Sequence, residues 1–395
     1  MKRVNVRTLL LGLALAGGLA SLPVTVGGSS LGFAMRAAAQ EAVAQAGGHE
    51  QHHPGAQSQV SAGHVGVVQG TVWVADEYGN GLTVIDAATN QVVTRLTGVE
   101  GPHNLQVAPD GQTVWAVSGH EKLALSIDAA TYRLLGTVPT GNEPAHIILT
   151  PDGRTAYATN GDDNTVTAID VATMQAIATI PVGEYPHGLR PSPDGKWVYV
   201  ANARDRTLSI IDTASNANIA DVEVGQSPVQ VGFSADGRFA YFSLNAENAV
   251  GKLDVASRAL LGKLQVGVGP IQVYVSPDDK FLLVANQGTR SNPSTTVSIV
   301  DTGRFEVVRT VETGLGAHGV VIDPSSRHAY ISNIYADNVS VIDLLEGGVV
   351  ATIPTGAGPN GISFSSLPPA PAAAPEIKLT LPEHTDDAPM PGMQH

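Results

Sequence analysis

The chain contains no cysteine. This absence excludes disulfide bonds, thiolate nucleophiles, cysteine-ligated zinc sites and copper centres bridged by cysteine sulfur. Positive charge is also scarce, because 22 Lys and Arg stand against 36 Asp and Glu, for a formal net charge of −14. A surface of that sign repels phosphate backbones, so binding to nucleic acid is disfavoured.

Long apolar runs are missing after residue 39, where no segment approaches the length of about 18 residues that a membrane span needs. The N-terminus has basic residues at Lys2 and Arg3, an apolar stretch over 9–20 and an Ala-rich cleavage site at 37–39. This pattern predicts an export signal over residues 1–39, with an uncleaved membrane anchor as the alternative. Cleavage would remove four basic residues and no acidic one, which takes the net charge from −14 to −18. We therefore expect a periplasmic or extracellular protein with no membrane span once the signal is removed.

A helical period is absent, and a longer repeat takes its place. Aspartates that end a β-branched run recur at spacings of 42, 42, 42, 42, 47 and 42 residues, namely Asp86, Asp128, Asp170, Asp212, Asp254, Asp301 and Asp343. Each unit contains a proline turn, an apolar strand, an Asp-Gly turn such as SPDG at 192–195, and further short strands such as VYVAN at 198–202. Seven such units, each with four antiparallel strands, predict an all-β, seven-bladed β-propeller.

The two ends of the repeat array predict how the ring closes. The first unit lacks the strand that follows the proline turn and begins directly at 71–75, whereas a spare strand of that kind stands at 359–364. We expect this C-terminal strand to complete the first blade, which would bury two exposed strand edges. The expected propeller spans 67–366, between a flexible His/Gln/Gly-rich linker over 40–66 and a flexible Pro/Ala-rich tail over 367–395.

Segments such as VYVANARDRTLSIID together with SPDG resemble the YVTN-repeat β-propeller family over about residues 65–366. The resemblance implies the propeller fold and leaves activity open, because relatives include surface-layer proteins, periplasmic proteins and the propeller of nitrous oxide reductase. In that reductase, histidines converge on a copper cluster and a cysteine-bearing copper domain supplies electrons. The full reductase activity is not expected in a chain without cysteine.

Candidate site residues gather at one mouth of the predicted channel, where the turns leading into the inner strands and the loops between second and third strands open on one face. Aligned by the repeat, the polar side chains there are His103, His120, His146, His187, Arg204, Arg206, Gln230, Gln272, His318 and Asn360. They predict a ligand site. The aligned His103, His187 and His318 further suggest copper or another divalent metal. Alternatively, the imidazoles cap backbone groups or line a wet channel, because Val229 and Ile271 interrupt the ring of histidines.

Other polar features have simpler readings. The five extra residues within 286–296 mark either a binding face or a tolerated insertion. The repeated aspartates recur in every unit and a column of asparagines in four of them, namely Asn160, Asn202, Asn286 and Asn333, and this repetition indicates turn-stabilising hydrogen bonds. An HExxH match at 49–53 is flanked by Gly and Pro, which argues against the helix that a metalloprotease needs. With Met390, Met393 and His395 it suggests instead an unstructured tail or a loose metal chelator.

The sequence thus predicts an exported, monomeric, non-enzymatic binding or scaffold protein that presents its top face to a protein, a glycan or a small ligand. A periplasmic copper- or haem-handling protein that uses the histidines is one alternative. A lactonase-like hydrolase or lyase is another. After residue 39 the chain carries neither a G-x-S-x-G elbow nor a P-loop, so these two motifs give no support to catalysis.

Overall fold

A computed structural model describes residues 68–382. The expected export signal over 1–39, the linker over 40–66 and the HExxH match lie outside the described residues, as do the terminal methionines and His395. Within residues 68–382, no helix is long and apolar enough to cross a bilayer.

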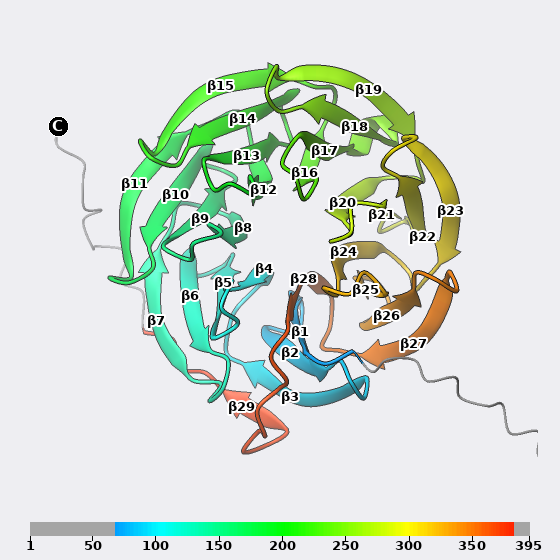
Figure 1. Ribbon diagram of the computed structural model, residues 1–395. Coiled ribbons are helices and arrows are strands. Elements are labelled where there is room, and N and C mark those ends of the chain that lie inside the picture. Colours follow the sequence, from blue (N-terminus) through cyan, green and yellow to red (C-terminus); the bar gives the residue numbers. More distant parts are fainter. Residues whose placement is uncertain (1–67, 383–395) are drawn as a thin grey trace, which may run out of the picture. The chain divides into compact units, whose positions relative to one another are not determined.

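Seven β-sheets surround a central channel in the described part of the chain (Figure 1). Six sheets contain four strands each in chain order, and the seventh contains five. The neighbouring strands of each repeat unit pair antiparallel, as β9 and β10 (Thr155–Asn160 and Thr165–Asp170) do over their whole length. This arrangement confirms the predicted seven-bladed propeller with four antiparallel strands per blade.

The blades follow one plan from the channel outward. The inner strands are β4 (Pro102–Val107), β8 (Pro144–Leu149), β12 (Pro186–Pro191), β16 (Pro228–Phe233), β20 (Pro270–Val275), β24 (Ala317–Ile322) and β28 (Pro359–Ser365). The second strands are β1 (Thr71–Asp76), β5 (Thr113–Ser118), β9 (Thr155–Asn160), β13 (Trp197–Asn202), β17 (Phe239–Leu244), β21 (Phe281–Thr289) and β25 (His328–Asn333). The third strands are β2 (Gly81–Asp86), β6 (Leu123–Asp128), β10 (Thr165–Asp170), β14 (Thr207–Asp212), β18 (Ala249–Asp254), β22 (Asn292–Asp301) and β26 (Asn338–Asp343). The outer strands are β3 (Gln91–Thr97), β7 (Leu134–Pro139), β11 (Gln175–Pro181), β15 (Ala217–Glu223), β19 (Ala259–Gln265), β23 (Glu306–Glu312) and β27 (Gly348–Pro354).

The ring closes through a strand from the C-terminal end of the array. Strand β28 pairs antiparallel with β1, from Thr71 opposite Ser365 to Val74 opposite Ile362. The first blade therefore takes its inner strand from the end of the chain and its other three from the beginning, as the sequence predicted. This pairing covers the edge of β1 that would otherwise be free and links the two ends of the repeat array.

The expected flexible tail needs a correction over 368–382. Strand β29 (Glu376–Lys378) adds to the outer edge of the first blade and pairs parallel with β3. Leu379 is buried, and the Thr94 hydroxyl donates to the carbonyl of Ala374 at 2.9 Å. The Pro/Ala-rich composition concealed this contact because a three-residue strand is held by the edge it joins rather than by its own propensity.

The core lies between blades. In β9 and β13 every residue after the first is buried, whereas the outer strand β15 alternates half-buried and exposed side chains. Tyr157 of one blade packs with Val198 and Ile211 of the next. Because the middle strands are covered on both faces, most of their side chains are apolar or small. Buried polar groups among them form hydrogen bonds, as the Thr159 hydroxyl does to a backbone carbonyl and the Asn160 amide does to a neighbouring hydroxyl.

The strand-ending aspartates close the turns between third and outer strands. Asp170 Oδ1 accepts hydrogen bonds from the Thr173 N–H and hydroxyl at 2.7 and 2.8 Å. Asp212 makes the same pair with Ser215. The structural interpretation of these aspartates is confirmed.

The five extra residues of the sixth blade lengthen a hairpin rather than form a loose loop. Strands β21 and β22 continue pairing to Thr289 opposite Asn292. From this hairpin Gln287 Nε2 donates to the Tyr335 hydroxyl at 3.2 Å, and the Arg290 guanidinium lies 5.6 Å from the centre of the Tyr78 ring. The insertion therefore reaches over the seventh blade toward the first, on the face that carries the loops between second and third strands.

Candidate functional site

The inner strands carry a backbone irregularity where they enter the channel. Strand β4 pairs with β5 at Pro102 opposite Ser118 and next at Leu105 opposite Ala116, so one extra residue is accommodated between the two pairs. Strand β12 has the same shift. A bulge of this kind changes the direction of the side chains beside it, so two successive positions of one strand can both lie near the mouth.

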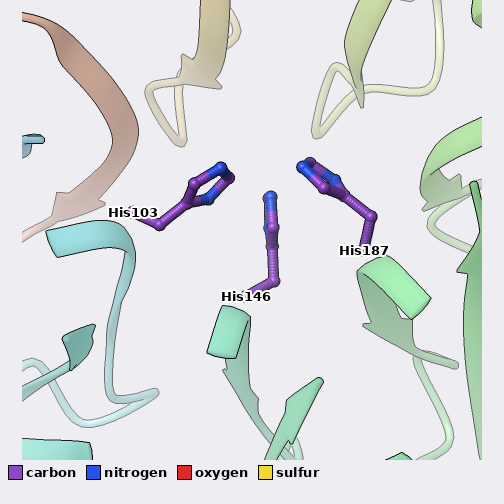
Figure 2. Close-up of side chains that lie close together, drawn as sticks. All are labelled: His103, His146 and His187. Atoms are coloured by element: carbon purple, nitrogen blue, oxygen red, sulfur yellow. The ribbon is translucent and has the colours of Figure 1, made fainter. Parts of the chain in front are cut away.

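Three histidines from consecutive blades converge at this mouth (Figure 2). His103 from β4, His146 from β8 and His187 from β12 point toward one another, and each offers a ring nitrogen within 4.8 Å of the others. The ring centres are 5.4 Å apart for His103 and His146, 5.1 Å for His103 and His187, and 4.7 Å for His146 and His187. His318 from β24 is the next neighbour, with its ring centre 6.3 Å from that of His103.

The structure thus brings together two of the three aligned histidines proposed as metal ligands, with His146 rather than His318 in the third place. The alignment put His146 one position further along its strand, with Ala145 at the shared position. The bulge explains why the offset does not separate them, because neighbouring positions of the inner strands reach the same space.

Hydrogen bonds orient the rings of His187 and His146. His187 Nδ1 donates to the carbonyl of Val229 at 3.3 Å, which leaves the lone pair of the neutral ring on Nε2. Gln230 holds its Oε1 on the N–H of Val231 at 2.8 Å and its Nε2 3.4 Å from His146 Nδ1. In residues 68–382, His103 Nδ1, His146 Nε2 and His318 Nδ1 are buried without a hydrogen-bond partner. Such nitrogens cost free energy until a ligand or solvent satisfies them.

Burial keeps the imidazoles of His146, His187 and His318 neutral. It lowers the pKa of His187 to about 3, with the neighbouring His103 adding to the shift. Burial also lowers the pKa of His146 and of His318 well below the usual value, and nearby imidazoles contribute again. Neutral imidazole is the form that binds metal ions, so the mouth is ready to coordinate at ordinary pH.

The remaining predicted residues divide between the channel and the rim. Gln230, Gln272 and Asn360 are buried in the channel, where Asn360 Nδ2 donates to Glu77 Oε2 at 2.7 Å. His120, Arg204 and Arg206 are exposed on the rim and apart from the histidine cluster. Arg204 stacks 3.7 Å above the Tyr185 ring and pairs with Asp162, and Arg206 pairs with Glu223.

Two channel residues were missed from the sequence. Arg190 and Tyr274 lie deeper than the histidines and line a cavity with His146, Gln230 and Gln272. They occupy one aligned position, three residues after the histidine position of each inner strand, and the repeat alignment could have revealed them had it been continued along the strand.

A comparison with family models adds the evolutionary context. The model for YNCE-like β-propellers matches residues 123–367, well over half of the chain. The chain belongs to the YNCE-like β-propeller family. A search of curated proteins found no significant match to this YNCE-like propeller.

Solved structures agree with the architecture of this YNCE-like propeller. A chain of hydrazine synthase from Kuenenia stuttgartiensis is similar at 24% identity and a TM-score of 0.62, over 68% of this chain and 90% of that one. A protein of unknown function from Desulfotomaculum acetoxidans is similar at 17% identity and a TM-score of 0.67, over 75% of this chain and 99% of that one. The dihydro-heme d1 dehydrogenase NirN matches at 15% identity and a TM-score of 0.55, over 74% of each chain. At these identities the likeness concerns the fold alone.

Proposed function

We propose that this YNCE-like propeller is an exported binding protein whose ligand is a transition-metal ion, copper or zinc, held at the channel mouth by His103, His146 and His187. The observation that carries the proposal is the convergence of three imidazoles from three consecutive blades, with a ring nitrogen of each within 4.8 Å of the others. Neutral nitrogen donors of intermediate softness suit both metals, and copper(II) binds such sites more tightly than zinc.

The arrangement fits an ion after a small closure of the rings. Nitrogens bound at about 2 Å from a tetrahedral zinc ion are about 3.4 Å apart, so separations of up to 4.8 Å would shorten by roughly 1.4 Å. Rotation of the imidazoles about their side-chain bonds can supply that movement without displacing the strands. A bound ion would also satisfy ring nitrogens that are buried without partners, at His103 Nδ1 or His146 Nε2.

Gln230 would orient one ligand. Its Nε2 now faces His146 Nδ1 at 3.4 Å, which places the proton of the neutral ring on Nε2. Coordination through Nε2 would move that proton to Nδ1, and the amide of Gln230 would accept it through Oε1 at the expense of the present hydrogen bond from the N–H of Val231. Partners of this kind fix the tautomer and orientation of metal-bound histidines in proteins.

The test is a titration of the metal-free full-length protein with copper(II) and with zinc(II). We compare wild type with a variant that carries His103→Gln, His146→Gln and His187→Gln. Both proteins keep the histidines and methionines outside residues 68–382, so binding by those segments is a common background. We expect wild type to bind one more equivalent than the triple variant, with a clearly tighter phase.

Single substitutions define the ligand set. His120→Gln, which changes an exposed histidine of the rim, should leave the additional equivalent intact. His146→Gln should weaken binding more than His318→Gln, because His146 belongs to the converging set. Equal stoichiometry and affinity in wild type and triple variant would refute metal binding at the mouth and leave a binding module for a non-metal ligand.

A further inference from the structure

A cationic side chain lies in the central channel without an acidic partner. Arg190 Nη1 donates to the amide oxygen of Gln106 at 3.4 Å, and the guanidinium carbon lies 5.7 Å from the centre of the Tyr274 ring. Among residues 68–382 no carboxylate forms an ion pair with Arg190, whereas the rim arginines Arg204 and Arg206 each have one. A charge removed from water is costly unless an opposite charge compensates it.

The space beside Arg190 is enclosed and polar. A cavity of about 50 Å³ is bordered by Arg190, Gln106, Gln272, Tyr274 and His146, together with other channel residues. Gln272 is only 4% exposed, and its Nε2 has no hydrogen-bond partner in the described part of the chain. The cavity is larger than one water molecule requires. Its wall offers unsatisfied N–H donors and one positive charge, which is the character of an anion site.

The guanidinium can be reached without passing the histidines. A second hollow, of about 230 Å³, lies at the far ends of the inner strands and also contains Arg190 and Tyr274 in its wall. Gly232 stands between them at the same aligned position and carries no side chain to fill the gap. This hollow connects the guanidinium with the face opposite the histidine mouth.

We propose that the channel binds a small planar oxyanion, of the class of formate or nitrate, between the Arg190 guanidinium and the Gln272 amide. The planar fork of an arginine matches two oxygens of such an ion, and an amide N–H of Gln272 can serve a further oxygen lone pair. The narrow space beside Arg190 favours a small anion over a bulky one. The site is distinct from the proposed metal site, although His146 borders both.

The site electrostatics support the same assignment. Burial lowers the pKa of Arg190, which disfavours the charged form of the guanidinium. A bound anion would offset this effect, because it supplies the negative charge that the surrounding side chains lack. Partial exclusion of bulk water would also strengthen the contact between anion and guanidinium.

The test uses metal-free full-length protein in buffers of equal sodium concentration that differ only in the anion. Formate and nitrate are the probes, and gluconate, a far bulkier carboxylate, is the control. We expect formate or nitrate to raise the melting temperature of wild type in a saturable manner. Arg190→Gln should weaken the apparent affinity by about tenfold or more, since a charge-assisted contact is lost. Arg204→Gln, a rim arginine, should respond as wild type does.

Two outcomes would overturn the proposal. One is an equal response of Arg190→Gln and wild type to the probes. The other is a melting temperature of Arg190→Gln that lies below that of wild type by the same amount in formate, nitrate and gluconate. That result would assign Arg190 a packing role. If Arg190→Gln fails to fold, Gln272→Leu takes its place in the experiment. We expect this variant to bind formate or nitrate more weakly than wild type does. Unchanged binding would count against the site. Because no metal is present, these results do not depend on the proposed function.

Discussion

At the scale of single residues, Asp76 departs from the pattern of its column. In the third blade the aligned residue is Asn160, whose Nδ2 donates to the Thr165 and Thr167 hydroxyls at 2.9 Å each. Asp76 receives the Thr83 hydroxyl on Oδ2 at 2.6 Å, while its buried Oδ1 has no partner in the described residues. Burial accordingly raises the pKa of Asp76 to about 7. A carboxyl group thus occupies a slot shaped for an amide.

Asp76→Asn should therefore stabilise the protein. The native carboxyl holds its proton up to about pH 7, whereas the unfolded chain releases it near the ordinary aspartate pKa of about 3.9. The contribution of Asp76 to the free energy of unfolding therefore falls as pH rises between those two values. We expect the variant to gain about 2 kcal/mol at pH 8, with the gain shrinking as pH falls toward 4. Urea denaturation at several pH values measures it. The reciprocal Asn160→Asp should destabilise, most at high pH, and an unchanged Asp76→Asn would contradict the assignment.

The repeated aspartates give a second prediction for single residues. Asp170→Ala removes the acceptor of two hydrogen bonds from Thr173 in an exposed turn. We expect a loss of about 1 kcal/mol in the free energy of unfolding and no change in metal or anion binding. Denaturation and binding titrations on the same variant decide the matter. A large loss of binding at unchanged stability would show that the aspartate serves the site instead.

At the scale of elements, closure depends on β28. Truncation before Pro359 removes the inner strand of the first blade and exposes the edge of β1. We expect this truncation to open the ring, because the pairing between β28 and β1 is lost. The melting temperature should fall sharply and unfolding should lose its cooperativity. Truncation after residue 382 removes no described element and serves as the control. Equal melting of the two truncated proteins would refute the closing role of β28.

The added strand β29 makes a smaller contribution. Truncation after Leu367 removes β29 and the buried Leu379 from the outer edge of the first blade but leaves the ring closed. We expect a modest loss, of about 2–3 kcal/mol from the buried leucine, with unfolding still cooperative. Leu379→Ala in the full chain should reproduce most of it. A truncated protein as stable as the full chain would restore the flexible tail that the composition suggested.

At the scale of the whole molecule, the histidines of the channel mouth make the stability of the ring depend on pH. His146, His187 and His318 come from different blades, and burial lowers the pKa of each. The unfolded chain takes up protons near the ordinary histidine value of about 6.5, and the native rings do not, so stability falls as pH drops below about 6.5. Metal affinity at the mouth should fall over the same range, because protons compete for the ring nitrogens.

Denaturation between pH 7.5 and pH 5 measures this dependence. The Asp76→Asn background is the suitable one, because Asp76 has the opposite slope in this range. In that background His187→Gln should reduce the loss of stability on acidification, since one buried imidazole no longer resists protonation. An unchanged pH dependence would mean that His187 is protonated as easily in the native protein as in the unfolded chain.

The sequence by itself determined the number of blades, the strand order and the way the ring closes. The local signals are proline turns, Asp-Gly turns and runs of buried strand residues. One repeat unit alone would not identify the fold, but seven units at a spacing near 42 residues do. The sequence also indicated that histidines such as His103 and His187 would lie near one mouth, because aligned repeats occupy equivalent places in the ring.

Only the tertiary structure decided which side chains meet. It placed His146 beside His103 and His187, set the unpaired Arg190 next to Gln272, and added β29 to the edge of β3. These contacts depend on the bulges of the inner strands and on distances of a few ångströms across the channel. A repeat period gives the angular position of a blade but not how far a side chain reaches toward the axis, so such contacts follow from packing between segments distant in the chain.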